Sequence, residues 1–168
     1  MRTVIIMAFA ALGLSATAWA QSPLKPLAVD RTYVSSADIT AIMNKIAAEG
    51  TGQKSESGAR LLQSGSFKSN MEYRTAVSTS GLHETEDEFF FVVDGSGTLV
   101  TGGKLINPKR QDAKNILGTG LEGGTAQKIG KGDAVVVPRN TPHWFSAING
   151  RLVLISMRLP EAASAPRP

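Results

Sequence analysis

From Ala59 onward, the chain consists of short segments rich in β-branched and aromatic residues, separated by glycine-containing turns. Turns are expected at residues 80–81, 94–97 and 149–150. Strands are predicted at residues 60–64, 71–78, 88–93, 97–101, 134–138, 143–148 and 152–159. Many short strands at this spacing are typical of an all-β sandwich or barrel. We therefore expect a small antiparallel β-barrel.

The first twenty residues have the pattern of a secretory signal peptide. Arg2 provides the positive n-region, residues 4–14 form an apolar core, and Ala18-Trp19-Ala20 is an A-x-A cleavage site. The alternative is a membrane anchor, but the apolar core runs about a dozen residues against the roughly 20 needed to span a bilayer. We therefore expect a periplasmic or secreted protein with no membrane association after cleavage.

The remaining chain has the length of a single domain. Residues 21–58 read as an N-terminal extension with one short amphipathic helix, which has Ser36 as its N-cap and Gly50 as its stop. Residues 59–160 form the predicted barrel, and residues 161–168 a disordered tail. The chain has no cysteine, which removes disulfides and thiolate ligands.

The formal net charge is +4 and the basic residues are scattered. The one short cluster comprises Lys109, Arg110 and Lys114, and it is interpreted as a solvated loop. Because no basic stripe with interleaved aromatic residues is present, nucleic acid is not an expected partner.

Two segments depart from the simple strand pattern. Residues 89–93 are apolar on both faces, so one face should line the barrel and the other should meet another sheet or a second subunit. A homodimer is therefore expected.

Residues 106–131 are rich in Gly, Asn and Lys and longer than most structureless connections. A lid over the site and a surface excursion without function are both open.

The chain has only two histidines, and both lie at strand entrances. His143 follows a turn–strand–turn segment that begins at Gly132, and His83 lies in the turn before the strand that Glu88 begins. Alternation along these strands directs Phe90 and Phe145 inward with Glu88 and His143. Two imidazoles and one carboxylate on one side of an ion suit Fe(II), and can also hold Mn, Co, Ni or Zn.

An acidic run surrounds the carboxylate ligand, and such runs are usually solvated. Glu88 is the predicted ligand, with Glu84 or Asp87 as substitutes. A hydrophobic wall of Phe90, Phe145 and Trp144 would control access to the ion.

Residues 71–159 resemble a cupin, a small β-barrel family with two signature motifs. The second motif, G-x5-P-x-G-x2-H-x3-N, maps onto Gly132, Pro138, Asn140, His143 and Ala147, with its second glycine and its final asparagine replaced. The first, G-x5-H-x-H-x3-4-E-x6-G, maps its glutamate and last glycine onto Glu88 and Gly95, and its second histidine onto His83. Its first histidine position is Gly81, so one of the family's usual four ligands is missing.

The chain also looks like small exported single-domain cupins of the cupin-2-like kind, with the motifs H-E-x-x-D-[DE]-x-F from His83 and E-G-G-T from Glu122. The resemblance implies a double-stranded β-helix, or jelly-roll, barrel, here with the one N-terminal helix. It also implies a metal site formed by His83, Glu88 and His143, and a dimer.

Three functions remain open. The first is a divalent-metal enzyme acting on a small oxygen-bearing molecule by oxygenase, isomerase or lyase chemistry. A proton-transfer mechanism would also need a base, for which Glu84 and Tyr73 are candidates, with Glu86 and Asp87 also near in sequence. The second is a binding module that holds a small ligand or a metal without turnover, and the third is a metal-free structural cupin.

Overall fold

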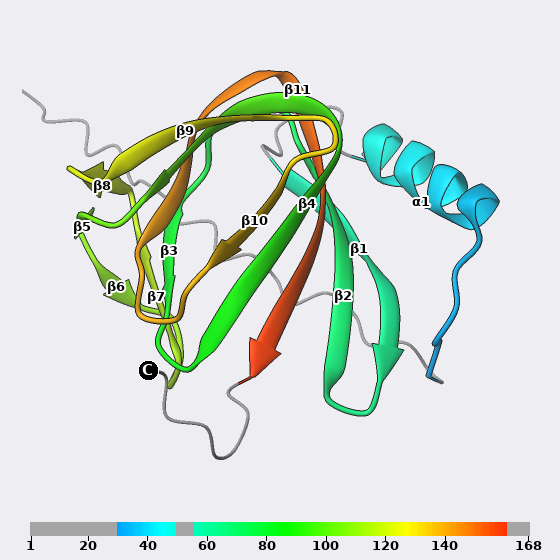
Figure 1. Cartoon of the computed structure of the whole chain (residues 1–168), viewed down its shortest axis with the longest axis horizontal. Coiled ribbons are helices and arrows are strands. Elements are labelled where there is room, and N and C mark those ends of the chain that lie inside the picture. Colours follow the sequence, from blue (N-terminus) through cyan, green and yellow to red (C-terminus); the bar gives the residue numbers. More distant parts are fainter. Residues whose placement is uncertain (1–29, 50–55, 161–168) are drawn as a thin grey trace, which may run out of the picture.

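The computed structural model describes residues 30–49 and 56–160. Two long strands organise it: β4 (Glu86–Thr101) and β11 (His143–Pro160) pair antiparallel over most of their length. On the far side of β4, β10 pairs with its first half and β9 with its second half. β2 pairs with the second half of β11, and β1 pairs with β2. The strands thus wrap around a common interior (Figure 1).

The other elements are short. Their bounds are α1 (Ser36–Glu49), β1 (Glu56–Ser64), β2 (Phe67–Arg74), β3 (Ser80–His83), β5 (Lys104–Ile106), β6 (Lys109–Arg110), β7 (Asn115–Gly118), β8 (Gly120–Glu122), β9 (Thr125–Gly130) and β10 (Ala134–Val137). Every strand pair among the described residues is antiparallel, in agreement with the predicted antiparallel barrel. Among the described residues, no helix is long and apolar enough to cross a membrane.

Two of the predicted turns are bends within β4 and β11. Both strands continue through these bends instead of ending there. The segments at residues 94–97 and 149–150 lie opposite one another, where the register shifts between Ile148 and Leu152. Gly95 has φ +77°, and a Cβ there would lie on the Arg151 backbone carbonyl. Only glycine permits this close approach, so the two strands bend sharply and continue.

The expectation of a turn at residues 80–81 is wrong. Ser80–His83 forms β3, which pairs with β7 and touches β11 where His143 faces Gly81. His83 is therefore the last residue of a strand. The segment is too short for its alternation to be visible in the sequence.

Residues 106–131, expected from the sequence to be a loop, instead contain short strands. The segment contains β6 to β9, of two to six residues each, and β9 pairs with β4. These strands are too short for apolar periodicity to mark them in the sequence.

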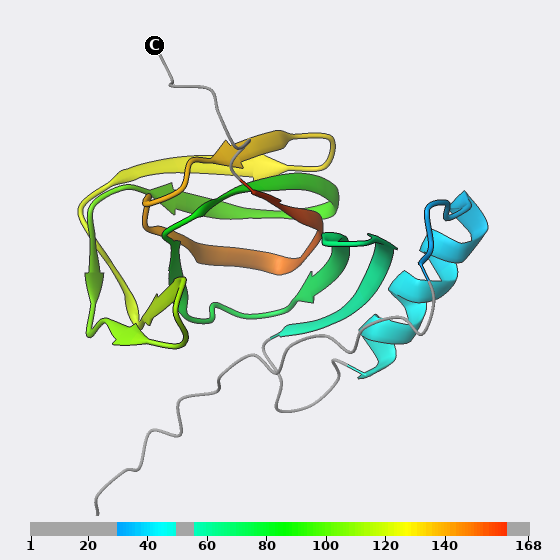
Figure 2. The ribbon, with the colours of Figure 1, turned by 90° about the horizontal axis from the view of Figure 1, so that it is seen from below.

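The core lies in two clusters on opposite faces of the sheet formed by β1, β2 and β11. One fills the barrel and includes Phe90, Val92, Leu99, Phe145 and Leu154. The second lies beneath α1 around Ile46, Leu61, Met71 and Val153, so the helix covers the outside of the barrel as expected (Figure 2).

The helix begins with a capping box one residue earlier than predicted. Ser35 Oγ accepts a hydrogen bond from the Asp38 amide at 3.1 Å, and the Asp38 carboxylate accepts one from the Ser35 amide at 3.2 Å. Ser35, not Ser36, is therefore the N-cap.

Candidate metal centre

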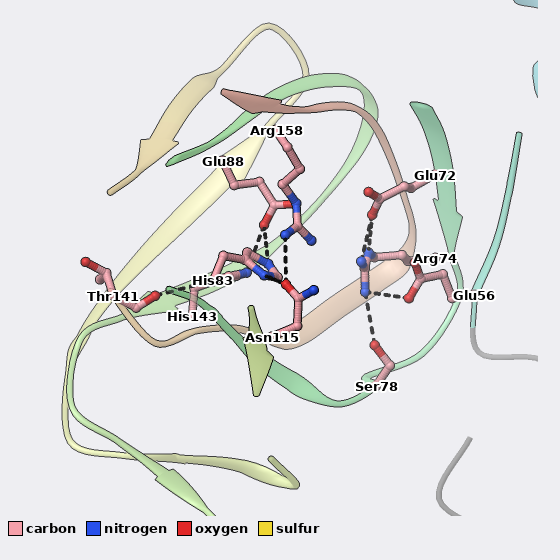
Figure 3. A network of polar contacts seen from close by, with 10 residues as sticks. All are labelled: Glu56, Glu72, Arg74, Ser78, His83, Glu88, Asn115, Thr141, His143 and Arg158. Carbon is pink, nitrogen blue, oxygen red and sulfur yellow. Dashed lines mark hydrogen bonds and ion pairs between the residues drawn. The ribbon is translucent and has the colours of Figure 1, made fainter. Parts of the chain in front are cut away.

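The inward faces of three strands bring His83, Glu88 and His143 together (Figure 3). His143 begins β11 directly opposite Gly81, and His83 lies two residues further along β3 on the same face. The two imidazole centroids are consequently 5.1 Å apart. Glu88 enters from β4, where it pairs with Arg158 of β11.

The three side chains present a compact set of donor atoms. Glu88 Oε2 lies 3.0 Å from His143 Nε2 and 3.2 Å from His83 Nε2. One ligand atom from each residue lies within 4.8 Å of the other two. All three residues are buried, with exposed fractions of 5 to 7%. Two neutral nitrogens and one carboxylate oxygen at these positions suit a divalent first-row metal ion.

Asn115 at the start of β7 fixes the orientation of His83. Its Oδ1 lies 2.6 Å from His83 Nδ1, and its Nδ2 lies 2.9 and 2.7 Å from the two carboxylate oxygens of Asp112. Because a carboxylate only accepts, the amide nitrogen must face Asp112 and Oδ1 must accept from His83. The Nδ1 proton is thus held by Asn115, and Nε2 is directed at the cluster.

His143 is oriented in the same way by the backbone. Its Nδ1 lies 3.2 Å from the Thr141 carbonyl oxygen, which only accepts, so Nδ1 carries the proton and Nε2 faces Glu88. The preceding turn is tied to β3, since the Asn140 amide donates to the His83 carbonyl at 2.7 Å. Both imidazoles are therefore held by groups outside the donor set.

Arg158 holds the other oxygen of Glu88. Its Nε donates to Glu88 Oε1 at 2.7 Å, and its Nη1 lies 3.4 Å from Asn115 Oδ1. Burial alone raises the pKa of Glu88, but its contacts with the His143 and His83 ring nitrogens and the charge of Arg158 outweigh that effect. The pKa of Glu88 is consequently held well below the ordinary value, and the carboxylate is ionised.

Two of the predicted wall residues border the cluster. The Phe90 ring lies 6.1 Å from the His143 ring and 5.3 Å from that of Phe145, against which it packs edge to face. Trp144 follows His143 on the opposite face of β11, and its Nε1 donates to the Ser78 carbonyl at 2.9 Å. Trp144 therefore lies outside the barrel interior.

A second polar cluster lies beside the first in the barrel (Figure 3). Arg74 Nη1 lies 2.8 Å from Glu56 and 3.0 Å from Ser78 Oγ, and its Nη2 lies 2.6 Å from Glu72. Its guanidinium also lies 4.8 Å from the centre of the Phe145 ring. The buried charge of Arg74 is thus fully paired within the protein.

The candidate bases lie away from the donor atoms. Glu84 pairs with Arg110 through both carboxylate oxygens, at 2.8 and 2.9 Å, and this hydrogen bonding lowers its pKa. Tyr73 packs against the cluster beneath α1, on the opposite face of β2 from Arg74. Asp87, a substitute ligand, instead accepts from the Arg139 amide at 2.8 Å. Of the acidic run, Glu88 alone enters the cluster of donors found among the described residues.

Two of the three departures from the family motifs have structural explanations. Asn140, in place of a glycine, has φ +62°, a left-handed conformation that Asn tolerates better than most residues. Gly81, in place of a histidine, leaves space: a Cβ there would lie 3.6 Å from His143 Nε2 and 3.9 Å from His83 Cε1. A histidine side chain at this position would therefore face the same cluster.

Sequence reasoning missed Asn115 and Arg158. Arg158 carried a signal, because it continues the inward phase of Leu152, Leu154 and Ser156 along an otherwise apolar strand. Asn115 carried none, since only the pairing of β7 with β3 places it beside His83.

The comparisons with known proteins agree with this architecture. A family model described as Cupin matches residues 37–164. No curated protein sequence matches the chain significantly.

Three solved structures are similar to the chain at low identity. KdgF from Halomonas sp. is 15% identical with a TM-score of 0.47, covering 65% of this chain and 82% of its own. A putative mannose-6-phosphate isomerase from Ralstonia eutropha is 17% identical with a TM-score of 0.47, covering 66% and 89%. Iron(II)-loaded HppE is 16% identical with a TM-score of 0.48, covering 63% and 52%. Identities this low bear on the fold alone.

Proposed function

This chain belongs to the cupin family, and we propose that it binds a divalent metal ion through His83, Glu88 and His143 and acts on a small oxygen-bearing molecule. The observation that carries the proposal is the buried set of donor atoms within 4.8 Å of one another. Its two nitrogens are directed inward by Asn115 and the Thr141 carbonyl. Histidines that were merely polar edge residues would need neither burial nor such support.

A bound divalent ion would supply Lewis-acid activation and a template for a ligand oxygen. The protein's own groups prepare the site for it. Arg158 keeps one oxygen of Glu88 occupied, so that Oε2 alone faces the imidazoles. Phe90 and Phe145 form an apolar wall that limits access of water and lowers the local dielectric. Such a site is compatible with oxygenase, isomerase or lyase chemistry.

A non-catalytic role, in which the site holds a metal or small ligand without turnover, is the second candidate. Two observations favour it: Gly81 stands where the fourth ligand would be, and Glu84 is engaged by Arg110 at the surface. Asn115 and Arg158 contact the donor residues, but neither is a base at neutral pH. Proton transfer would therefore need a group supplied by the substrate or by bound water.

Metal reconstitution followed by substrate screening tests the proposal. Protein loaded with Fe, Mn, Co, Ni or Zn would be screened against hydroxy acids and sugar acids, under air and under nitrogen. Turnover that requires both metal and His143 would establish the enzyme. Saturable binding without product formation would establish the binding module. Absence of both metal and ligand binding would contradict both functions.

We further propose that the protein acts in the periplasm or is secreted, after removal of residues 1–20. The support is the signal-peptide pattern around Arg2 and Ala18-Trp19-Ala20, which lies outside the described residues. Mass spectrometry of the protein from a periplasmic extract should find an N-terminus at Gln21. An intact Met1 on the exported protein would contradict this.

We also propose a homodimer. The outer face of β4 and β10 leaves Phe91 38% and Val136 53% exposed on neighbouring strands, an apolar area that a second copy would cover. Light scattering after size exclusion should give the mass of two chains, and Val136→Lys should give that of one. A monomer in the unaltered protein would reject the dimer.

A further inference from the structure

The inner face of the sheet carries three arginines at related positions: Arg60 on β1, Arg74 on β2 and Arg158 on β11. Pairing places Arg60 opposite Asn70, Asn70 opposite Ser156, and Ser156 opposite Phe90. Ala59 and Met71 pack beneath α1, so Arg60 and Asn70 face the other way. They share that face with Leu154, Phe90 and the metal-site carboxylate.

Two of these arginines are neutralised by the protein. Arg74 is bound by Glu56 and Glu72, and Arg158 by Glu88. Arg60 differs: within the described residues its guanidinium has no hydrogen bond or ion pair, and its Nε is buried without a partner. Partial burial lowers the pKa of Arg60, with no nearby carboxylate to offset the loss of solvent.

Asn70, the cross-strand neighbour of Arg60, has a buried acceptor atom without a hydrogen-bond donor in the described part of the chain. Its Oδ1 is buried and accepts no hydrogen bond from the described residues. A donor and an acceptor thus remain unused side by side, although buried polar groups are almost always paired. A single water could satisfy both atoms, but the half-buried guanidinium would still have no counter-charge from the described residues.

We propose that Arg60 and Asn70 form a subsite for an oxyanionic group, carboxylate or phosphate, of the molecule that binds at the metal centre. The proposal rests on the proposed function and adds the substrate class: a small molecule with a metal-binding oxygen at one end and an anionic group at the other. Guanidinium groups bind both oxyanions through paired N–H donors. The Asn70 amide oxygen accepts from a hydroxyl adjacent to the anionic group.

The register gives the scale of the ligand. Arg60 lies three strands from Phe90, a backbone separation of about 14 Å at the usual ~4.8 Å strand spacing. The distance between the functional groups is shorter than this backbone separation, because the Arg60 side chain extends inward from one end and the Glu88 side chain from the other. This span corresponds to a molecule with a chain of a few carbon atoms rather than to a macromolecular partner.

Calorimetry on the metal-loaded protein, residues 21–168, tests the subsite with defined probes. Glutarate and glycerol 2-phosphate represent the two oxyanions, and glutaramide and glycerol are their neutral counterparts. We expect the anions to bind and the neutral probes not to bind. The tighter of the two anions identifies the group. Arg60→Gln should weaken binding at least tenfold. Lys68→Gln, which removes an exposed charge from the adjacent strand, should change it less than twofold.

Asn70→Asp provides a second, independent readout. It places a carboxylate beside Arg60, so the protein itself supplies the missing anion. We expect a higher melting temperature and loss of glutarate binding. Failure of the unaltered protein to bind either anion, or equal binding by Arg60→Gln, would overturn the subsite even if metal is bound. Arg60-dependent binding in a protein that holds no metal would instead support the subsite and contradict the metal centre.

Discussion

Arg158 contacts Glu88 through the carboxylate oxygen that does not face the two imidazoles. Its Nε lies 2.7 Å from Oε1, whereas Oε2 lies within 3.2 Å of both histidine Nε2 atoms. One oxygen of the carboxylate is therefore fixed by the Arg158 guanidinium, and the other is directed at the two imidazoles. This arrangement keeps Glu88 ionised and limits it to one free ligand atom.

The low pKa of Glu88 predicts acid sensitivity of the metal-free protein. A carboxyl whose pKa is lower in the folded than in the unfolded state stabilises the fold above its unfolded pKa. That contribution is lost as the pH falls below the ordinary value of 4.5. Glu88→Gln should therefore reduce the decrease in the free energy of unfolding between about pH 6 and about pH 3, a range that spans the pKa of ~4.3 of a free Glu. Urea titration across this range measures it, with exposed Glu49→Gln as control. An unchanged slope in Glu88→Gln would contradict the ionised carboxylate.

Arg158→Met should shift the same acid transition to higher pH. The substitution removes the charged donor to Oε1, so the pKa of Glu88 is depressed less and the carboxyl protonates earlier. Arg151→Met is the matched control, because it breaks a similar bond to Asp94 at the surface, far from the donors. Circular dichroism during acid titration compares the two. Equal midpoints for both variants would show that Arg158 has no influence on Glu88.

Asn115→Leu should weaken metal binding without abolishing it. The substitution leaves the three donors in place but frees the His83 ring to rotate and to use its other tautomer. Loss of such a supporting hydrogen bond typically reduces metal affinity ~10–100-fold. Competition with a coloured chelator measures the affinity, and Asn149→Leu in the exposed bend is the control. Affinity within twofold of the unaltered protein would remove Asn115 from the site.

Two glycines on paired strands should respond oppositely to alanine. Gly81→Ala places its methyl group at ordinary contact distance, 3.6 to 3.9 Å, from the two imidazoles. It should be neutral or stabilising by up to ~1 kcal/mol, with metal content unchanged. Gly118→Ala would place Cβ 2.7 Å from Ser80 Oγ and 2.8 Å from the Ile106 carbonyl, and should cost ~1–3 kcal/mol. Thermal unfolding of both variants measures the change in stability. Destabilisation by Gly81→Ala would show that there is no room for a methyl group beside the two imidazoles.

Much of the fold was predictable because the barrel strands alternate clearly. Glu88, Phe90 and Val92 share one phase, as do His143 and Phe145, and the structure places these side chains in the barrel interior. Strand ends were less predictable. Gly95 and Gly150 mark bends at which β4 and β11 continue, and a glycine-rich bend looks like a chain reversal in sequence.

The residues that hold the donor side chains in place could largely not be predicted from the sequence. Asn115 belongs to a four-residue strand in a polar, glycine-rich segment, and only its pairing with β3 brings it to His83. The partnership of Arg158 with Glu88 depends on the β4–β11 register, which joins residues 70 positions apart. Trp144 was misplaced because its proximity to His143 outweighed strand alternation, which sends it to the other face.

Metal content of the mature protein, residues 21–168, tests the central claim most directly. The protein would be purified without a metal-binding tag, reconstituted with Fe, Mn, Co, Ni or Zn, and compared with His143→Ala by elemental analysis. We predict close to one metal ion per chain in the unaltered protein and none in the variant, which retains Glu88 and His83 but lacks the third donor. No metal in either protein, or equal metal in both, would contradict a centre formed by His83, Glu88 and His143.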